Sequence, residues 1–219
     1  MNKFLPYILI SFALLGGFYL KHYLELSSTA ESDIIASTSN NKIENLFESL
    51  LVYPKKNPVF DFTLVDHTKK PFKTEHFKGY WNLIFTGYTN CPDICPPTLT
   101  QMAQMYQLMD QQTRDKFQII FLSVDPARDT PDHLKQYLDY FHHDFIGISG
   151  EESQIDGLVK SLGGIYYINQ EKGEFYTVDH SARIFIVGPN AERYGIVKSG
   201  IIKANNKSQL VADLTKMAE

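Results

Sequence analysis

The stretch NLIFTGYTNCPDICPPTLTQM, Asn82 to Met102, decides the fold because it joins an apolar run, two cysteines and a helical pattern. Its first part, Asn82 to Tyr88, is apolar and aromatic, which predicts an interior strand. We expect Gly87 to let the backbone turn out of this strand. From Thr98 to Gln112 the apolar residues recur with helical spacing. The stretch therefore predicts a strand that leads through a short loop into a helix.

Two cysteines lie on this predicted loop, Cys91 and Cys95, in a C-x-x-x-C spacing. Pro96 and Pro97 lie at the join, where a missing N–H does little harm if Pro97 is the first helical residue, so both cysteines lie beside a helix N-terminus. Unpaired N–H groups and the helix dipole at such a position favour the thiolate over the thiol. The spacing suits a soft metal ion, a small disulfide or a merely structural pair, and it does not choose among the three.

The remainder of the chain alternates predicted strands and helices. The expected strands are 59–64 and 71–72 in an edge hairpin, then 117–124, 145–148, 165–168, 182–187 and 194–202, and the expected helices are 131–141, 153–162 and 208–217. Strand, helix and strand in this order predict a parallel pair with a right-handed crossover. The fold class is therefore α/β, a thioredoxin-like arrangement with a central mixed sheet flanked by helices. This topology puts the cysteines at the C-terminal edge of a central strand, where open α/β sheets bind ligands.

Composition narrows the functional classes. The chain has 219 residues, 43% of them hydrophobic and 13% aromatic, which suits one domain with appendages. A net charge of −4 without a basic cluster argues against a nucleic-acid partner. Two cysteines are too few for a disulfide-dense scaffold.

The N-terminus predicts a membrane anchor. Residues 4–20 carry no charge, and we favour an uncleaved anchor in 1–26 over a cleaved signal peptide. Residues 27–57 are predicted as a flexible tether and 58–219 as the folded domain. No arginine precedes Arg114, which argues against a mitochondrial transit peptide. We therefore expect a bacterial inner-membrane protein whose domain faces the periplasm.

One histidine stands apart from the other six. His180, in VDHSARIFIV, is expected where a loop leads into an apolar strand, against the cysteine loop. A neutral imidazole there could complete a site of two sulfurs and one nitrogen, and a packed or capping role is the alternative. The others are expected as solvated surface residues: His22, His67, His76, His133, His142 and His143.

Four segments occurring in order carry a family resemblance: GYTNCPDICPPTLTQM, LSVDPARDTPDHLKQYLDYF, FIGISG and VDHSARIFIVGP. From Pro58 to the C-terminus the chain resembles the Sco/SenC family of membrane-anchored copper chaperones. The resemblance implies one copper bound by Cys91, Cys95 and His180. It also implies help in assembling the dinuclear copper centre of cytochrome c oxidase. Some members of this family act instead as thiol-disulfide reductants or redox sensors.

The donor set agrees with copper, because thiolates suit Cu(I) and imidazole suits Cu(I) and Cu(II). Zinc is a rival for the same three ligands, but the sequence places no general base for hydrolysis. A thiol-disulfide oxidoreductase using Cys91 and Cys95 is the main alternative function. A peroxiredoxin-like peroxidase is disfavoured, because the residues before Cys91 do not reproduce the pocket of that family. The expected partners are the copper-binding oxidase subunit and a periplasmic copper donor or thiol reductant.

Three aspartates have open roles in this prediction. Asp93 lies between the cysteines and either tunes the thiols or caps the helix. Asp125 either approaches the site or caps the DPARDTP loop. Asp179 adjoins His180, but neighbours along a strand face opposite sides, which argues against a hydrogen bond between their side chains.

Overall fold

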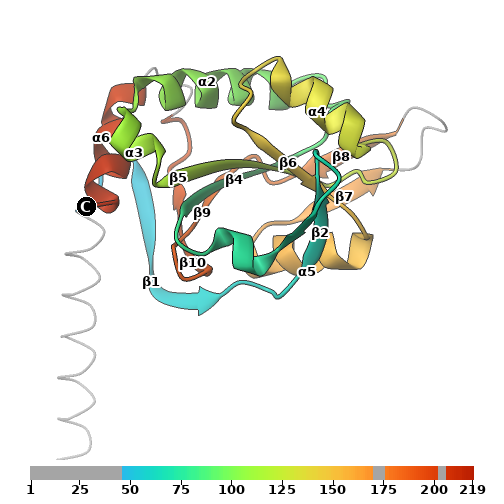
Figure 1. Ribbon diagram of the computed structural model, residues 1–219, viewed down its shortest axis with the longest axis horizontal. Coiled ribbons are helices and arrows are strands. Elements are labelled where there is room, and N and C mark those ends of the chain that lie inside the picture. Colours follow the sequence, from blue (N-terminus) through green and yellow to red (C-terminus); the bar gives the residue numbers. More distant parts are fainter. Residues whose placement is uncertain (1–45, 170–175, 202–205) are drawn as a thin grey trace, which may run out of the picture. The chain divides into compact units, whose positions relative to one another are not determined.

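An eight-stranded mixed sheet crosses the domain in the order β1-β10-β9-β4-β5-β6-β2-β3 (Figure 1). The computed structural model describes residues 46–169, 176–201 and 206–219. The strands are β1 (Leu50–Pro58), β2 (Thr63–Asp66), β3 (Pro71–Lys73), β4 (Trp81–Gly87), β5 (Phe117–Ser123), β6 (Ile146–Ser149), β9 (Ile184–Val187) and β10 (Glu192–Val197). A separate antiparallel pair is formed by β7 (Tyr166–Asn169) and β8 (Thr177–His180).

Helices cover both faces of the sheet. They are α2 (Cys95–Leu108), α3 (Gln111–Arg114), α4 (Pro131–Asp139), α5 (Glu152–Leu162) and α6 (Lys207–Met217), with a 3-10 turn η1 (Thr74–Phe77). Figure 1 shows α2 and α4 on one side and α5 on the other, and α6 packs against α2. The mixed sheet with flanking helices confirms the predicted fold class in its coarse form.

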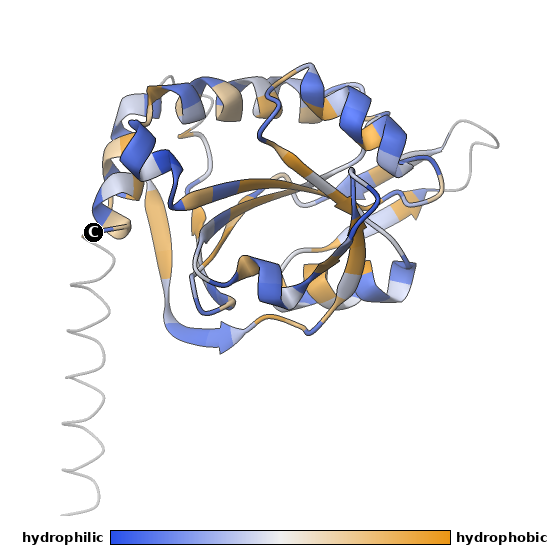
Figure 2. Cartoon of the chain, in the orientation of Figure 1, coloured by the Kyte–Doolittle hydropathy of each residue, from blue (hydrophilic) through white to orange (hydrophobic). Residues whose placement is uncertain are grey.

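The centre of the sheet is parallel, as its apolar runs predict. β4 pairs in parallel with β5, and β5 pairs in parallel with β6. Leu83 to Phe85 and Ile119 to Leu122 are buried, the pattern of strands covered on both faces. Figure 2 shows these strands as predominantly hydrophobic, whereas the helices mix hydrophobic and hydrophilic residues. The hydrophobic core therefore supports the C-terminal end of β4, from which the cysteine loop leaves.

The predicted helix over 98–112 is two helices. α2 begins at Cys95, with Pro96 and Pro97 in its first turn, where missing N–H groups cost no intrahelical bond. It ends because Met109 is extended, and Asp110 then caps α3 by accepting a 2.7 Å hydrogen bond from the Thr113 backbone N–H. Cys95, which we expected on the loop before the helix, is therefore the first residue of the helix.

The segment before β9 also differs from the prediction. We expected one strand over 182–187, preceded by a loop, but residues 177–180 form β8 and pair antiparallel with β7. β9 begins only at Ile184. His180 is therefore the last residue of β8, opposite Tyr166.

The folded unit begins before the predicted boundary at residue 58. It spans Phe47–Glu219, and β1 pairs antiparallel with β10 from Leu50 onward. The end of the predicted tether is therefore part of the sheet. Within residues 46–169, 176–201 and 206–219, no helix has the length and apolar character needed to cross a bilayer. The predicted anchor and residues 27–45 of the predicted tether lie outside the described residues.

Candidate metal centre

Three side chains with metal-binding atoms meet at the C-terminal end of β4. The ligand atoms of Cys91, Cys95 and His180 all lie within 4.8 Å of one another. Cys91 is on the loop after β4, Cys95 begins α2, and His180 ends β8. Cys95 Sγ and His180 Nε2 are 3.5 Å apart, although the two residues are 85 positions apart in the sequence. The fold thus brings together the three residues that the sequence singles out.

The two thiols are free and unequally buried. Cys91 is 7% exposed and Cys95 is fully buried. Burial raises the pKa of Cys95 far above its usual value, and this effect outweighs a backbone hydrogen bond from Tyr88 that favours the thiolate. The expectation that the helix N-terminus makes a thiolate is therefore wrong for Cys95 in the metal-free protein. A bound cation reverses this balance, because a coordinating thiol loses its proton.

His180 is held as a neutral ring. Burial lowers its pKa, with the Ser181 backbone and Asp179 acting weakly in the opposite direction. The ring meets the aromatic rings of Phe85 and Tyr88 edge-on, at centroid distances of 6.2 and 6.0 Å. This packing coexists with the approach of Nε2 to Cys95, so a packed position does not prevent a ligand role.

β4 supports the centre directly. Thr86 Oγ1 donates a 2.9 Å hydrogen bond to the Ser181 carbonyl oxygen, which fixes the residue after His180. Gly87 remains in β4, opposite Ser123. A Cβ at Gly87 would lie 2.6 Å from Cys95 Sγ and 2.7 Å from a ring carbon of Phe121. Gly87 is therefore required for the space it leaves to Cys95, and not for the turn that we expected it to make.

A buried carboxylate, Asp125, ties the loop after β5 to the segment before β8. It is 1% exposed, accepts a hydrogen bond from the Tyr176 hydroxyl at 2.6 Å, and forms an ion pair with Arg128. The Arg128 guanidinium also lies over the Tyr176 ring, 3.7 Å from its centroid. Asp125 is not in the cluster of ligand atoms. It orders its own loop and also holds the chain that leads to His180.

A second buried carboxylate, Asp129, was missed by sequence reasoning. It accepts hydrogen bonds from the backbone N–H and hydroxyl of Thr89 and from the Ser123 hydroxyl. Burial raises the pKa of Asp129, and these hydrogen bonds lower it in part. The only sequence signal was a second acidic residue in DPARDTP, which a loop-capping role explains equally well. Asp129 fixes Thr89, two residues before Cys91.

The other two aspartates face solvent. Asp93 is exposed, and α2 begins without a side-chain hydrogen bond from its cap residue, Ile94. Asp179 accepts a 2.7 Å hydrogen bond from Asn169 across the hairpin. It lies opposite Tyr167 in the register, so it faces away from His180 as expected.

The other described histidines lie outside this cluster, although two have structural roles that we did not predict. His67 Nδ1 accepts a hydrogen bond from the Gly147 N–H, and His76 Nδ1 accepts one from the Lys73 N–H. His133 and His143 are exposed, and His142 is half-buried. His22 lies outside the described residues.

His142, His143 and Asp144 form a second group with closely spaced ligand atoms. The Nδ1 lone pair of His142 already accepts a 3.2 Å hydrogen bond from the Asp144 N–H. The other two side chains are solvent-exposed. We therefore assign no metal to this group.

Comparison with known proteins agrees with this geometry. The family model described as SCO1/SenC matches residues 53–219. The chain belongs to the SCO1/SenC family. A "Putative copper-binding protein" of Stutzerimonas stutzeri is 38% identical over 151 residues, covering 69% of this chain and 74% of that protein. An "SCO2-like protein" of Rickettsia felis is 36% identical over 60% of this chain and 65% of its own length. The matches thus span about three quarters of the Stutzerimonas protein and just under two thirds of the Rickettsia protein.

The fold also matches solved SCO1/SenC structures. Bradyrhizobium japonicum ScoI with copper bound is 32% identical, with a TM-score of 0.65, over 73% of this chain and 99% of that chain. The apo Sco1 protein of Thermus thermophilus is 31% identical, with a TM-score of 0.67, over 78% of this chain and 96% of that chain.

Proposed function

We propose that this protein binds one copper ion through Cys91 Sγ, Cys95 Sγ and His180 Nε2. The observation that carries the proposal is the convergence of these atoms within 4.8 Å from three separate elements. Two thiolates and a neutral imidazole suit both oxidation states of copper. Protein-bound zinc, a cation of similar size, lies about 2.3 Å from sulfur and about 2.0 Å from nitrogen, which puts tetrahedral S and N ligands about 3.5 Å apart. The Cys95–His180 distance of 3.5 Å therefore suits one ion between the two atoms.

Family membership supports a role for this copper as cargo for the copper centre of cytochrome c oxidase. The copper-containing ScoI of Bradyrhizobium japonicum and the Stutzerimonas relative support copper as the metal. The uncharged residues 4–20 support an anchor in the bacterial inner membrane, with the domain in the periplasm. The oxidase subunit that receives copper is then the principal partner, and a periplasmic copper donor or thiol reductant is a second one.

The chain's own residues prepare the site for an incoming ion. Burial keeps His180 neutral, so a nitrogen lone pair is available without prior deprotonation. Cys95 is a buried thiol, and its proton must leave when a cation binds. The missing side chain of Gly87 leaves room for Cys95 Sγ. Three protein ligands leave a further position open for a group of the donor or acceptor protein.

The direct test is copper binding by the full chain and its His180→Ala variant. Loss of one of three ligands should weaken copper affinity by about 100-fold or more, beyond the 10- to 100-fold typical of lost supporting contacts. His143→Ala is the matched control, because His143 is 81% exposed and outside the cluster. Equal affinity and stoichiometry in all three proteins would overturn the proposed ligand set.

A second function, thiol-disulfide exchange by Cys91 and Cys95, is favoured by one observation. Both cysteines are free, and Cys91 is the more accessible of the two. Cys91 would attack a partner disulfide and Cys95 would resolve the mixed disulfide. The His180→Ala variant separates the two functions, because a dithiol reductant should keep its exchange rate in this variant.

A further inference from the structure

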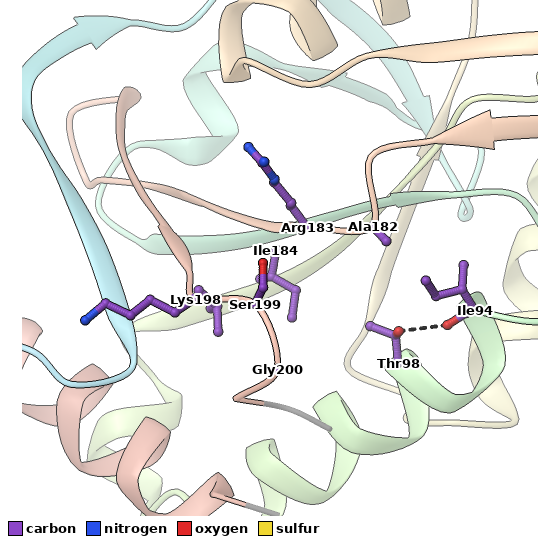
Figure 3. Close-up of a pocket in the computed structure, with 9 residues that line it drawn as sticks. Ile94, Thr98, Ala182, Arg183, Ile184, Lys198, Ser199 and Gly200 are labelled. Atoms are coloured by element: carbon purple, nitrogen blue, oxygen red, sulfur yellow. Dashed lines mark hydrogen bonds between the residues drawn. The ribbon is translucent and has the colours of Figure 1, made fainter. Parts of the chain in front are cut away.

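A groove lies beside the metal centre and is not used by the three ligands. It has a volume of about 470 Å³ and lies between the start of α2, the segment that leads into β9, and the end of β10 (Figure 3). Ile94, the cap residue of α2, and Thr98 in its first turn line one side, and Ser199 and Gly200 line it from the chain after β10. Ile94 directly precedes Cys95, so a molecule lying in the groove also lies beside the cysteine loop.

The segment before β9 offers unpaired backbone to this groove. β9 pairs with β4 and β10 only from Ile184 onward. Ala182 is exposed, and within the described ranges its N–H and carbonyl groups form no hydrogen bond. Unpaired backbone beside a strand is where an extended peptide adds to a sheet.

The charged residues that line the groove are both positive. Arg183 and Lys198 line it together with apolar and hydroxyl side chains, and no acidic residue does. Lys198 Nζ donates to the Phe47 carbonyl oxygen, whereas Arg183 is exposed and forms no ion pair with any residue that the structure describes. Figure 3 shows the Arg183 and Lys198 side chains extending in different directions, both away from Ile94 and Thr98 on the opposite side of the groove. This positive lining contrasts with the chain's net charge of −4, and it favours a segment with carboxylates.

We propose that the groove binds an extended, acidic segment of the protein that exchanges copper or electrons with Cys91 and Cys95. The segment would pair its backbone with Ala182 and place a carboxylate near Arg183. The inference rests on the proposed function, because only an exchange partner must bring its own ligand or thiol to these cysteines. It adds the surface and the chemistry by which that partner is recognised.

Thiol exchange gives a test that needs no copper. The probes are two five-residue peptides with a central cysteine, one with a glutamate and one with a lysine at each end. Each is supplied as a mixed disulfide with thionitrobenzoate. The Cys91 thiolate attacks the peptide sulfur and releases coloured thionitrobenzoate. Cys95 then displaces the peptide thiol and closes the Cys91–Cys95 disulfide, so two electrons pass from protein to probe.

Rates are measured on the reduced full chain at low salt. Each rate is divided by the rate of the same protein with the mixed disulfide of 2-mercaptoethanol and thionitrobenzoate, which cannot span the groove. The acidic peptide should react about fivefold faster than the basic one, because attraction to the groove raises the encounter rate. Arg183→Glu should abolish or reverse this preference. Ser199→Tyr, which fills the groove, should slow both peptides by about fivefold.

Lys78→Glu is the matched control for charge, because Lys78 is exposed and precedes β4, at the opposite end of that strand from the cysteines. It should keep the fivefold preference. Equal normalised rates for the two peptides, or a preference unchanged by Arg183→Glu, would overturn the inference. Copper stoichiometry of the same preparations keeps the two proposals apart. A wild-type protein that binds no copper but prefers the acidic peptide refutes only the copper proposal, and one that binds copper without a preference refutes only the groove.

Discussion

Gly87 is the residue whose substitution tests the space around Cys95 most directly. The added Cβ of Gly87→Ala would lie 2.6 Å from Cys95 Sγ and 2.7 Å from a Phe121 ring carbon, closer than side chains approach. We expect copper affinity to fall by about tenfold or more and stability by about 1–3 kcal/mol, the usual cost of overpacking. Copper titration and urea unfolding measure the two effects. Gly79→Ala is the control: its φ of +84° makes alanine strained, but no atom lies within 4 Å, so it should lose stability and keep copper affinity. Equal copper affinity in wild type and Gly87→Ala would contradict this account.

His180 should make the stability of the metal-free protein depend on pH. Burial lowers its pKa below 6.5, so the unfolded chain takes up the proton at a higher pH than the folded one. The contribution of neutral His180 to the free energy of unfolding is therefore complete above about pH 6.5. It is lost as the pH falls through the folded-state pKa, by at most about 1.4 kcal/mol per pH unit. Urea unfolding at pH 7.5 and 5.5 should show a smaller loss in His180→Ala than in wild type. His142 and Asp129 also have shifted pKa values, but both proteins contain them, so their contributions to the pH dependence of stability cancel in the comparison. Equal losses in the two proteins would contradict the burial of a neutral ring.

The residues that sequence could identify are those with distinctive chemistry. Cys91, Cys95 and His180 were predicted together because thiols and imidazole are rare and occurred in family motifs. Asp129 could not be identified, because its role depends on burial against Thr89, 40 residues away. Gly87 was identified as a turn residue, whereas its role is to leave space for Cys95 Sγ. The sequence could not show this role, because the two residues come close only after α2 has packed on the sheet.

At the scale of elements, the hairpin β7–β8 positions His180, and Tyr176 anchors that hairpin to the loop after β5. The Tyr176 hydroxyl donates to Asp125, which also holds Arg128. In Tyr176→Phe this hydrogen bond is lost, and we expect about 0.5–1.5 kcal/mol less stability. Amides of β8 should exchange faster with solvent, and copper affinity should fall severalfold at unchanged stoichiometry.

Tyr167→Phe is the matched control for this prediction. Tyr167 is in the same hairpin, is 63% exposed, and lies opposite Asp179. Its substitution should leave β8 exchange and copper affinity unchanged. If the two variants behave alike, the Tyr176–Asp125 contact does not position His180.

Periodicity predicted most elements but not their boundaries. The parallel strands β4 and β5 and the helices α4, α5 and α6 were predicted within about two residues, because their apolar pattern and caps agree. Thr130 caps α4, and Gly163 ends α5 in a left-handed conformation. The break between α2 and α3 was missed because the apolar spacing continues across it, whereas Met109 is extended and Asp110 caps a new helix. β8 was missed because its short sequence, TVDH, reads as a loop until it pairs with β7.

At the scale of the whole molecule, the strand β1 was not predicted. Residues 50–57 lay in the tether predicted over 27–57, and they contain two lysines, an asparagine and a proline. Leu50 and Val52 are nevertheless buried, and Ser49 donates two hydrogen bonds to the buried carboxylate of Asp213 in α6. An edge strand needs only a few buried positions, because its ladder with β10 comes from the backbone.

This difference predicts where a folded fragment can begin. A chain of residues 47–219 keeps β1, whereas a chain of 58–219 leaves one edge of β10 unpaired and loses the buried side chains of Phe47, Leu50 and Val52. At about 1.5–3 kcal/mol for each buried side chain, the shorter fragment should be at least about 5 kcal/mol less stable, much of the stability of an ordinary domain. Urea unfolding followed by circular dichroism compares the two fragments directly. Asp213→Asn in the longer fragment weakens the hydrogen bonds from Ser49 but keeps the pairing of β1 with β10. The free energy of unfolding should then fall by only about 1–3 kcal/mol. Equal midpoints for 47–219 and 58–219 would mean that β1 adds nothing to the domain, and the original boundary would then stand.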